Sequence, residues 1–179
     1  MPRNWDEHYA QGGAADEAPA GLLSEVAELV PPGRALDLAC GSGRNALYLA
    51  SLGWNVVAVD SSPEAIRIVR QRAYDMGCPI DARVADLETE EFPIEPEAYD
   101  LICDFFYLDR RLFSQIRQGV RPGGTVAAEI HLRDAAAHHF VLEPGELRRA
   151  FADWKILYYS EALRPGHHRP SAQLLARRA

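Results

Sequence analysis

The sequence predicts an α/β fold built on a mixed β-sheet, and three observations support this. Short apolar runs alternate with helical patterns along most of the 179 residues, which is typical of a parallel sheet covered by helices on both faces. A glycine-rich turn follows the first apolar run and precedes a helical pattern. The last two apolar runs have no helix between them, which indicates an antiparallel strand in the sheet.

The elements follow one another regularly. A first helical pattern extends from about residue 16 to residue 30, and Pro31-Pro32 ends it. The expected strands are Ala35–Cys40, Asn55–Asp60, Asp81–Ala85, Tyr99–Asp104, Thr125–His131, 154–160 and 171–178. The expected helices are Arg44–Leu52, Pro63–Met76, Arg110–Gly119 and Pro144–Ala152. The stretch "RPGG" at 121–124 predicts a helix stop and a turn before the fifth strand.

Composition narrows the class of protein. The hydrophobic fraction of 47% and the charged fraction of 25% are typical of a soluble globular domain. No run approaches the ~20 apolar residues of a membrane-spanning helix, and "MPRNWDEHYAQGG" lacks the apolar stretch of a signal peptide. We therefore expect a cytoplasmic protein. The net charge of −7, with arginines scattered apart from short pairs, predicts neither a nucleic-acid nor a membrane partner.

Cysteine and histidine spacing gives no sign of a metal site. The three cysteines are far apart and form no C-x-x-C motif, so we expect reduced thiols and no disulfide framework. The pairs His138-His139 and His167-His168 are adjacent in sequence and so do not share one helix face.

The stretch "ALDLACGSGRNALYLA" at 35–50 carries most of the functional signal. Gly41 and Gly43 lie between a strand and a helix, where a backbone can approach a ligand and free N–H groups meet an anion. Asp60 follows Gly41 by 19 residues and ends the second strand, where a carboxylate suits the hydroxyls of a ribose. These two features fit a nicotinamide dinucleotide and an adenosine-containing sulfonium about equally well.

Further features favour the sulfonium. Asp37 places a carboxylate before the glycines, where it would attract a cationic amino group and repel a pyrophosphate. Asp86, in "VADLE" after the third strand, lies where it can meet an adenine amino group. We also expect a single domain, whereas a dehydrogenase usually needs a second region for its substrate.

A family resemblance follows from these motifs. The segments "LDLACGSGRNALYLA", "VVAVDSSPEAI", "VADLE", "YDLICDFFYL" and "RPGGTVAAE" resemble, in order, the motifs of class I S-adenosylmethionine-dependent methyltransferases. The sequence departs from the family at Ala39, which stands where the family usually has a glycine, and this predicts a turn slightly further from the methionine group. With this resemblance we expect a Rossmann-like seven-stranded sheet of order 3-2-1-4-5-7-6 with strand 7 antiparallel.

The resemblance implies S-adenosyl-L-methionine as cofactor and assigns roles to its site. Asp37 and Gly41 would flank the methionine amino group, and Asp60 would hold the ribose. The full set of expected cofactor residues is Asp37, Ala39, Cys40, Gly41, Gly43, Asn45, Asp60, Ser61, Ser62, Asp86, Leu87 and Phe105. The segment "NWDEHYA" resembles the arm that often precedes this core. We therefore expect residues 1–30 to be an arm and helix covering the cofactor, and 31–179 to be a single methyltransferase domain.

Motifs in the second half of the chain limit the range of methyl acceptors that we expect. The segments "LEPGELRRAFADWKILYYSE", "HHR" and "LLARR" are similar to tellurite methyltransferases and their thiol- or thiopurine-methylating relatives. This resemblance implies that His168-Arg169 handles the acceptor and that Asp104 faces the methyl group. His131 ends the fifth strand at the same edge and is either a base or an ordinary strand-end histidine. The aromatic run 105–107 is either a lid or core packing.

The loop from Ser160 to Pro170 has a geometric argument of its own. The sixth strand is expected to be parallel to the first five, so its carboxyl end lies at the ligand-binding edge of the sheet. The loop therefore brings four potential cations to that edge, although a solvated hairpin tip is the alternative. These are Arg164, His167, His168 and Arg169.

The function we expect is methyl transfer from S-adenosylmethionine to a small molecule, such as a thiol or a reduced chalcogen. The expected catalytic residues are Asp104, His131, His168 and Arg169. Two alternatives are a nicotinamide-dependent oxidoreductase and a non-catalytic S-adenosylmethionine-binding module that regulates a partner. The sequence leaves the acceptor and the oligomeric state open.

Overall fold

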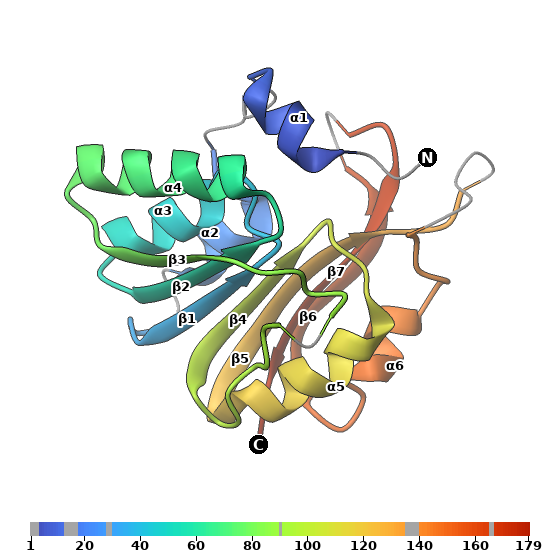
Figure 1. Cartoon of the computed structure of the whole chain (residues 1–179). Coiled ribbons are helices and arrows are strands. Elements are labelled where there is room, and N and C mark those ends of the chain that lie inside the picture. Colours follow the sequence, from blue (N-terminus) through green and yellow to red (C-terminus); the bar gives the residue numbers. More distant parts are fainter. Residues whose placement is uncertain (1–3, 13–17, 28–29, 90, 135–139, 165–166) are drawn as a thin grey trace. The chain divides into compact units, whose positions relative to one another are not determined.

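The computed structural model describes residues 4–12, 18–27, 30–89, 91–134, 140–164 and 167–179. Its seven strands form a sheet of order β3-β2-β1-β4-β5-β7-β6, which confirms the expected order. The chain divides into two compact units, Met1–Pro93 and Ile94–Ala179 (Figure 1). Within the described ranges, none of the helices has the length and apolar character that crossing a bilayer requires.

The first unit is a three-stranded parallel sheet with helices on one side. Its elements are α1 (Trp5–Ala10), α2 (Gly21–Ala27), β1 (Arg34–Leu38), α3 (Arg44–Ser51), β2 (Asn55–Asp60), α4 (Pro63–Met76) and β3 (Ile80–Val84). β2 pairs in parallel with β1 and with β3. Helices α2, α3 and α4 lie on the same side of these strands (Figure 1). The apolar residues of β1 and β2 are almost fully buried and form the core of this unit.

Local signals explain which boundaries of the first unit were predictable. β2 and α4 have the expected limits, and α4 begins where the Ser62 side chain accepts a hydrogen bond from the backbone N–H of Ala65. The first helix expected at about 16–30 is described only as α2, because residues 13–17 and 28–29 lie outside the described ranges. α1 was not expected. It buries none of its residues, so no apolar periodicity marks it in the sequence.

The second unit joins a parallel strand pair to an antiparallel hairpin. Its elements are β4 (Tyr99–Phe105), α5 (Arg110–Gly119), β5 (Val120–His131), α6 (Glu146–Ala150), β6 (Lys155–Leu163) and β7 (Pro170–Arg177). β4 and β5 are parallel, whereas β7 is antiparallel to both β5 and β6. β6 therefore runs parallel to β5, as expected. β6 extends to Leu163, so the loop before β7 is shorter than the expected 160–170. The pair His138-His139 lies outside the described residues.

The helix stop predicted at "RPGG" is confirmed, because α5 ends at Gly119, but the turn predicted there is wrong. Residues 121–124 belong to β5, where the pairing with β4 shifts register between Tyr99 and Leu101. The backbone N–H of Gly123 donates to the carbonyl of Arg178 (3.0 Å), and the N–H of Arg178 donates to the carbonyl of Gly124 (2.9 Å). Tertiary pairing thus satisfies this segment and keeps it in the sheet as an irregularity.

Candidate functional site

In the first unit, the chain turns from β1 to α3 through residues with positive φ. Gly41 has φ 54° and Gly43 has φ 87°, a conformation that glycine adopts without strain. A Cβ at Gly41 would collide with the hydroxyl of Tyr9 on α1, and one at Gly43 would lie 2.7 Å from Val69 on α4. Ala39 has φ 49° and is therefore a strained alanine at the position where the family usually has glycine.

Asp37 lies in β1 just before this turn and is 1% exposed. Its Oδ2 atom has no hydrogen-bond partner among the described residues. Burial raises the pKa of Asp37 to about 7, although the amide of Ala46 and the charge of Arg44 oppose the shift. A buried carboxylate oxygen without a partner costs free energy, so this atom is suited to receive a donor or a cation.

Asp60, at the end of β2, ties two turns together. Its Oδ2 accepts a hydrogen bond from the N–H of Gly41 (2.8 Å), and its Oδ1 accepts one from the N–H of Ser62 (2.9 Å). Burial is the main cause that raises the pKa of this carboxyl. A carboxylate has about four lone-pair positions, so Asp60 keeps capacity for further donors.

The N-terminal helix α1 is held against the same turns. The hydroxyl of Ser62 and the backbone N–H of Glu64 both donate to Oδ1 of Asp6, at 2.7 and 2.9 Å. These hydrogen bonds hold the pKa of Asp6 below its usual range, with the N–H of Glu64 the larger cause. The Tyr9 hydroxyl lies over the position of Gly41. The arm motif of the sequence is therefore next to the glycine turn. The role of Asp6 was missed, because no local pattern announces a contact across 56 residues.

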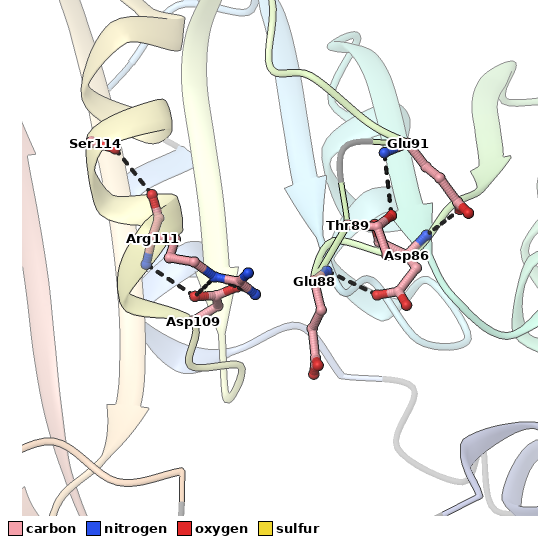
Figure 2. Close-up of polar contacts among 7 residues, drawn as sticks. All are labelled: Asp86, Glu88, Thr89, Glu91, Asp109, Arg111 and Ser114. Atoms are coloured by element: carbon pink, nitrogen blue, oxygen red, sulfur yellow. Dashed lines mark hydrogen bonds and ion pairs between the residues drawn. The ribbon is translucent and has the colours of Figure 1, made fainter.

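The side chains of two expected cofactor residues accept hydrogen bonds from backbone groups of the first unit. Oδ1 of Asn45 accepts a hydrogen bond from the N–H of Ala20 (2.9 Å) and anchors the segment before α2. Oδ1 of Asp86 accepts one from the N–H of Glu88 (2.8 Å), while the N–H of Asp86 donates to Oε2 of Glu91 (3.1 Å), as Figure 2 shows. Asp86 therefore caps a turn, and its second carboxylate oxygen has no hydrogen bond to another described residue.

The remaining expected residues of this unit differ in burial. Cys40 and Leu87 are buried, whereas Ser61 is exposed. Burial raises the pKa of the Cys40 thiol well above its usual value, and the charge of Asp37 adds to the shift. Cys40 is thus an unreactive buried thiol. The first unit brings together, around its two turns, Asp37, Ala39, Cys40, Gly41, Gly43, Asp60 and Ser62.

In the second unit, the end of β4 leads into a strained aromatic residue. Asp104 and Phe105 are buried, and Phe105 is part of the core. Phe106 has φ 64°, an outlier for a bulky side chain, and its N–H donates to the carbonyl of Glu129 (2.6 Å). The centroid of its ring lies 5.0 Å from the ring centroid of His131 and 6.1 Å from that of His167. Strain of this kind is often found at ligand sites.

His131 ends β5 beside this ring. Its Nδ1 atom is buried and has no hydrogen-bond partner in the part of the chain that the structure describes. Burial lowers the pKa of His131, and the positive charges of Arg169 and His167 contribute to the shift. The imidazole is therefore neutral at neutral pH and able to accept a proton. His168 and Arg169 are both exposed.

Glu129 is a buried acid on β5 that the sequence analysis missed. It is 1% exposed and accepts hydrogen bonds from Oγ of Ser171 (2.7 Å) and Nε2 of Gln173 (2.8 Å) on β7. An Nη1 atom of Arg164 lies 3.4 Å from its Oε2. The signal was an acid inside the apolar run "TVAAEIH", the same signal that identified Asp37.

Comparison with known proteins decides the family. The sequence model of the family described as tellurite resistance protein TehB matches residues 18–173. The chain belongs to the TehB family. Its membership confirms the resemblance to class I S-adenosylmethionine-dependent methyltransferases of the tellurite type.

Relatives of this TehB-family chain share about half of their length with it. It is 32% identical over 153 residues to "Hemagglutinin 1" of Eikenella corrodens, covering 79% of this chain and 50% of that protein. It is 26% identical over 153 residues to the "Probable S-adenosyl-L-methionine-dependent methyltransferase TehB" of Haemophilus influenzae, covering 79% and 52%. The crystal structure of TehB from Haemophilus influenzae has a TM-score of 0.81 at 24% identity, over 97% of this chain and 67% of that one. That likeness confirms the fold.

Proposed function

We propose that this TehB-family chain transfers the methyl group of S-adenosylmethionine to a small anionic acceptor with a soft nucleophilic atom. A thiolate and a reduced chalcogen oxyanion such as tellurite belong to this class. The observation that carries the proposal is the buried, unpartnered Oδ2 atom of Asp37. A cationic ammonium group is the partner that such an atom lacks, and the methionine part of the cofactor carries one.

The first unit holds the cofactor in this proposal. Asp37 binds the ammonium group, Asp60 accepts from the ribose hydroxyls, and Asp86 and Leu87 contact the adenine. S-adenosylmethionine, when bound, supplies a methyl group on a sulfonium sulfur, which is already a good leaving group. The chain's residues then mainly position the partners and exclude water.

The acceptor provides the electron pair for the step. Its lone pair forms the new bond to the methyl carbon, while the carbon–sulfur bond breaks and its electron pair stays on sulfur. A thiolate becomes a neutral thioether, and the tellurite dianion becomes a methylated monoanion, with no proton transferred. When the acceptor arrives as a thiol, the neutral imidazole of His131 takes its proton. The lowered pKa of His131 keeps it ready for this role.

Side chains of the second unit that can carry a positive charge recognise the acceptor. Arg164, His168 and Arg169 follow β6 in a chain whose net charge is −7. Arginine suits an oxyanion because its planar fork donates two parallel hydrogen bonds and its charge does not titrate. Cations held near a developing charge attract an anionic acceptor and stabilise its reaction.

Residues 1–30 act as a cover over the cofactor, and 31–179 form a single methyltransferase domain, in the same proposal. The contacts of α1 with the turns of the first unit support the cover. Asp6 accepts from Ser62, and Tyr9 lies over Gly41. Aromatic residues at this place would shield the bound cofactor from water.

The test is a methyl-transfer screen across thiols, selenite, tellurite, amines and hydroxyl compounds, read out as S-adenosylhomocysteine formed. A thermal-shift comparison precedes it, because a ligand that binds only the native state raises the melting temperature. S-adenosylhomocysteine should raise it and NAD should not. The proposal fails if S-adenosylhomocysteine gives no shift. Binding without turnover of any acceptor would favour the regulatory module.

A further inference from the structure

A polar cluster of the second unit surrounds one of the arginines proposed to recognise the acceptor, and its other members have no part in the chemistry described so far. The cluster consists of Glu129 on β5, Ser171 and Gln173 on β7, and Arg164 just beyond β6. We refer to it as the Glu129 cluster. Its three strands are adjacent in the sheet, with β7 between β5 and β6.

The strand register explains why these side chains meet. Glu129 pairs with Gln173, and His131 pairs with Ser171, across the antiparallel β5–β7 ladder. Directly opposite residues of an antiparallel pair project to the same face, as do residues two apart in one strand. Glu129 and His131 therefore share one face with the two β7 side chains. On the other side of β7, Leu163 pairs with Pro170, so Arg164 leaves the sheet at this same end.

The bonding of Glu129 is unequal in strength. Its two neutral donors lie at 2.7 and 2.8 Å, whereas Arg164 lies at 3.4 Å. The Arg164 side chain is 31% exposed, while that of Glu129 is 1% exposed. One guanidinium nitrogen thus faces the buried carboxylate, and a guanidinium has five N–H donors in a fixed plane. This single contact turns one guanidinium nitrogen toward the carboxylate, and the exposed part of the fork remains able to donate.

We infer that Glu129 is a positioning residue that holds the guanidinium of Arg164 for a small oxyanion acceptor. The inference rests on the proposed function and assigns its acceptor recognition to a specific pair. Glu129 itself does not touch the acceptor. Ser171 and Gln173 hold its carboxylate between β5 and β7 at 2.7 and 2.8 Å, so its orientation is transmitted to Arg164. Arg169, which is exposed, has no comparable anchor among the described residues.

The experiment measures steady-state methyl transfer to selenite and tellurite by the full-length protein. Glu129→Gln keeps the shape of the side chain but loses its charge. We expect it to raise the KM for selenite about fivefold or more, with kcat changed less than about twofold, because orientation of the fork is lost. Arg164→Gln should raise KM at least as much. The double variant should be no worse than Arg164→Gln alone, because residues that act through one another are not additive.

A matched control separates positioning from general effects. Arg133→Gln removes one arginine charge of this unit from its exposed pair with Glu143. This variant should keep the wild-type KM for selenite. If Glu129→Gln lowers the melting temperature and kcat but leaves KM unchanged, Glu129 is only structural and the inference is overturned. A lower KM would also overturn it.

A failure of the inference can be told apart from a failure of the proposed function. If the wild-type protein binds S-adenosylhomocysteine but methylates no oxyanion or thiol, the proposed function fails. Calorimetry with selenite on the S-adenosylhomocysteine-saturated protein then still tests the pair. Arg164→Gln should weaken selenite binding about fivefold or more, and equal binding by both proteins would refute the pair. This variant also decides the matter if Glu129→Gln does not fold.

Discussion

Asp37 in the first unit and Glu129 in the second are both carboxylates inside apolar strands, and each is 1% exposed. Their partners differ. Oδ2 of Asp37 has no hydrogen-bond partner among the described residues, whereas both oxygens of Glu129 accept hydrogen bonds from named side chains. Burial raises the pKa of Asp37 to about 7.

The difference separates two uses of a buried acid. An unsatisfied acid is costly to the free protein and gains most when a ligand supplies the missing partner. A satisfied acid costs less, and it holds the elements that supply its donors. Burial alone does not distinguish the two cases, but the inventory of donors around each oxygen does. Experiments on variants of the two residues test this contrast.

The largest effect is expected for cofactor binding by Asp37→Asn. The variant loses a charge-assisted hydrogen bond, so the affinity for S-adenosylhomocysteine should fall by about 2–3 kcal/mol, or roughly 30- to 150-fold. Glu129→Gln should change that affinity less than about twofold, because its contacts lie within the second unit. Isothermal calorimetry on both variants measures the two affinities. Similar losses in the two variants would remove the distinction between them.

The pH dependence of stability should sharpen the contrast. The pKa of Asp37 is about 7 in the native state and 3.8 as the ordinary value, so the native state binds more protons than the unfolded chain between these values. The stabilisation from the neutral form is present below pH ~4 and is lost as the pH rises through ~7. Urea unfolding of the ligand-free protein should show Asp37→Asn gaining on the order of 2 kcal/mol relative to wild type between pH 5 and pH 8.

Cofactor affinity should move in the opposite direction with pH. An ammonium group binds the ionised carboxylate, so wild-type affinity for S-adenosylhomocysteine should rise from pH 6 to pH 8 by about tenfold. Asp37→Asn should show a nearly flat profile over the same range and serves as the control. A flat wild-type profile would contradict the role of Asp37.

A smaller effect is expected where α1 meets the first unit. Asp6→Ala removes the acceptor for Ser62 and Glu64 and should loosen the cover, weakening S-adenosylhomocysteine binding about three- to fivefold. Glu7→Ala, on the same helix, is the matched control, since no hydrogen bond from its side chain holds α1 to α4 in the described structure. If Asp6→Ala binds like wild type, α1 does not act as a cover.

The smallest effect is expected at Ala39. Glycine relieves the left-handed conformation, which costs an L-residue about 1–2 kcal/mol, but it increases the freedom of the unfolded chain. We expect Ala39→Gly to stabilise the protein by about 0.5 kcal/mol, with cofactor affinity nearly unchanged. Thermal unfolding is the measurement. A clear loss of stability would show that the turn carries no strain at this residue.

Elements set by contacts between residues close in sequence could be predicted, whereas those set by contacts between distant residues could not. α4 and α5 could be located from local signals, because Ser62 and Asp109 cap their first turns. Figure 2 shows the Asp109 carboxylate accepting from the N–H of Arg111, while the Ser114 hydroxyl donates to the carbonyl of Arg111. The strand order agreed with the family resemblance. By contrast, the "RPGG" stretch was misassigned because its partner, Arg178, is distant in sequence.

The residues of the candidate site show the same difference in how well they could be predicted. Asp37, Gly41 and Asp60 were identified because their spacing along the chain is itself the signal. Glu129 carries the same local mark as Asp37, yet its meaning depends on β7, which is 42 to 44 residues away. Sequence patterns contain no information on which donors a later strand will bring. Long-range partners therefore decide what a buried acid does.

The position of β7 between β5 and β6 also has a consequence for assembly of the protein. β5 precedes both strands in the chain, so until β7 inserts it is an edge strand with unpaired backbone groups. Exposed apolar edges are where folding intermediates associate with one another. The Glu129 carboxylate interrupts the run "TVAAEIH" and disfavours such association, because a second chain would have to bury its charge without the donors of β7. β7 is the strand that supplies those donors. The Glu129 carboxylate that holds β5 and β7 together in the finished sheet therefore also disfavours aggregation while the sheet forms.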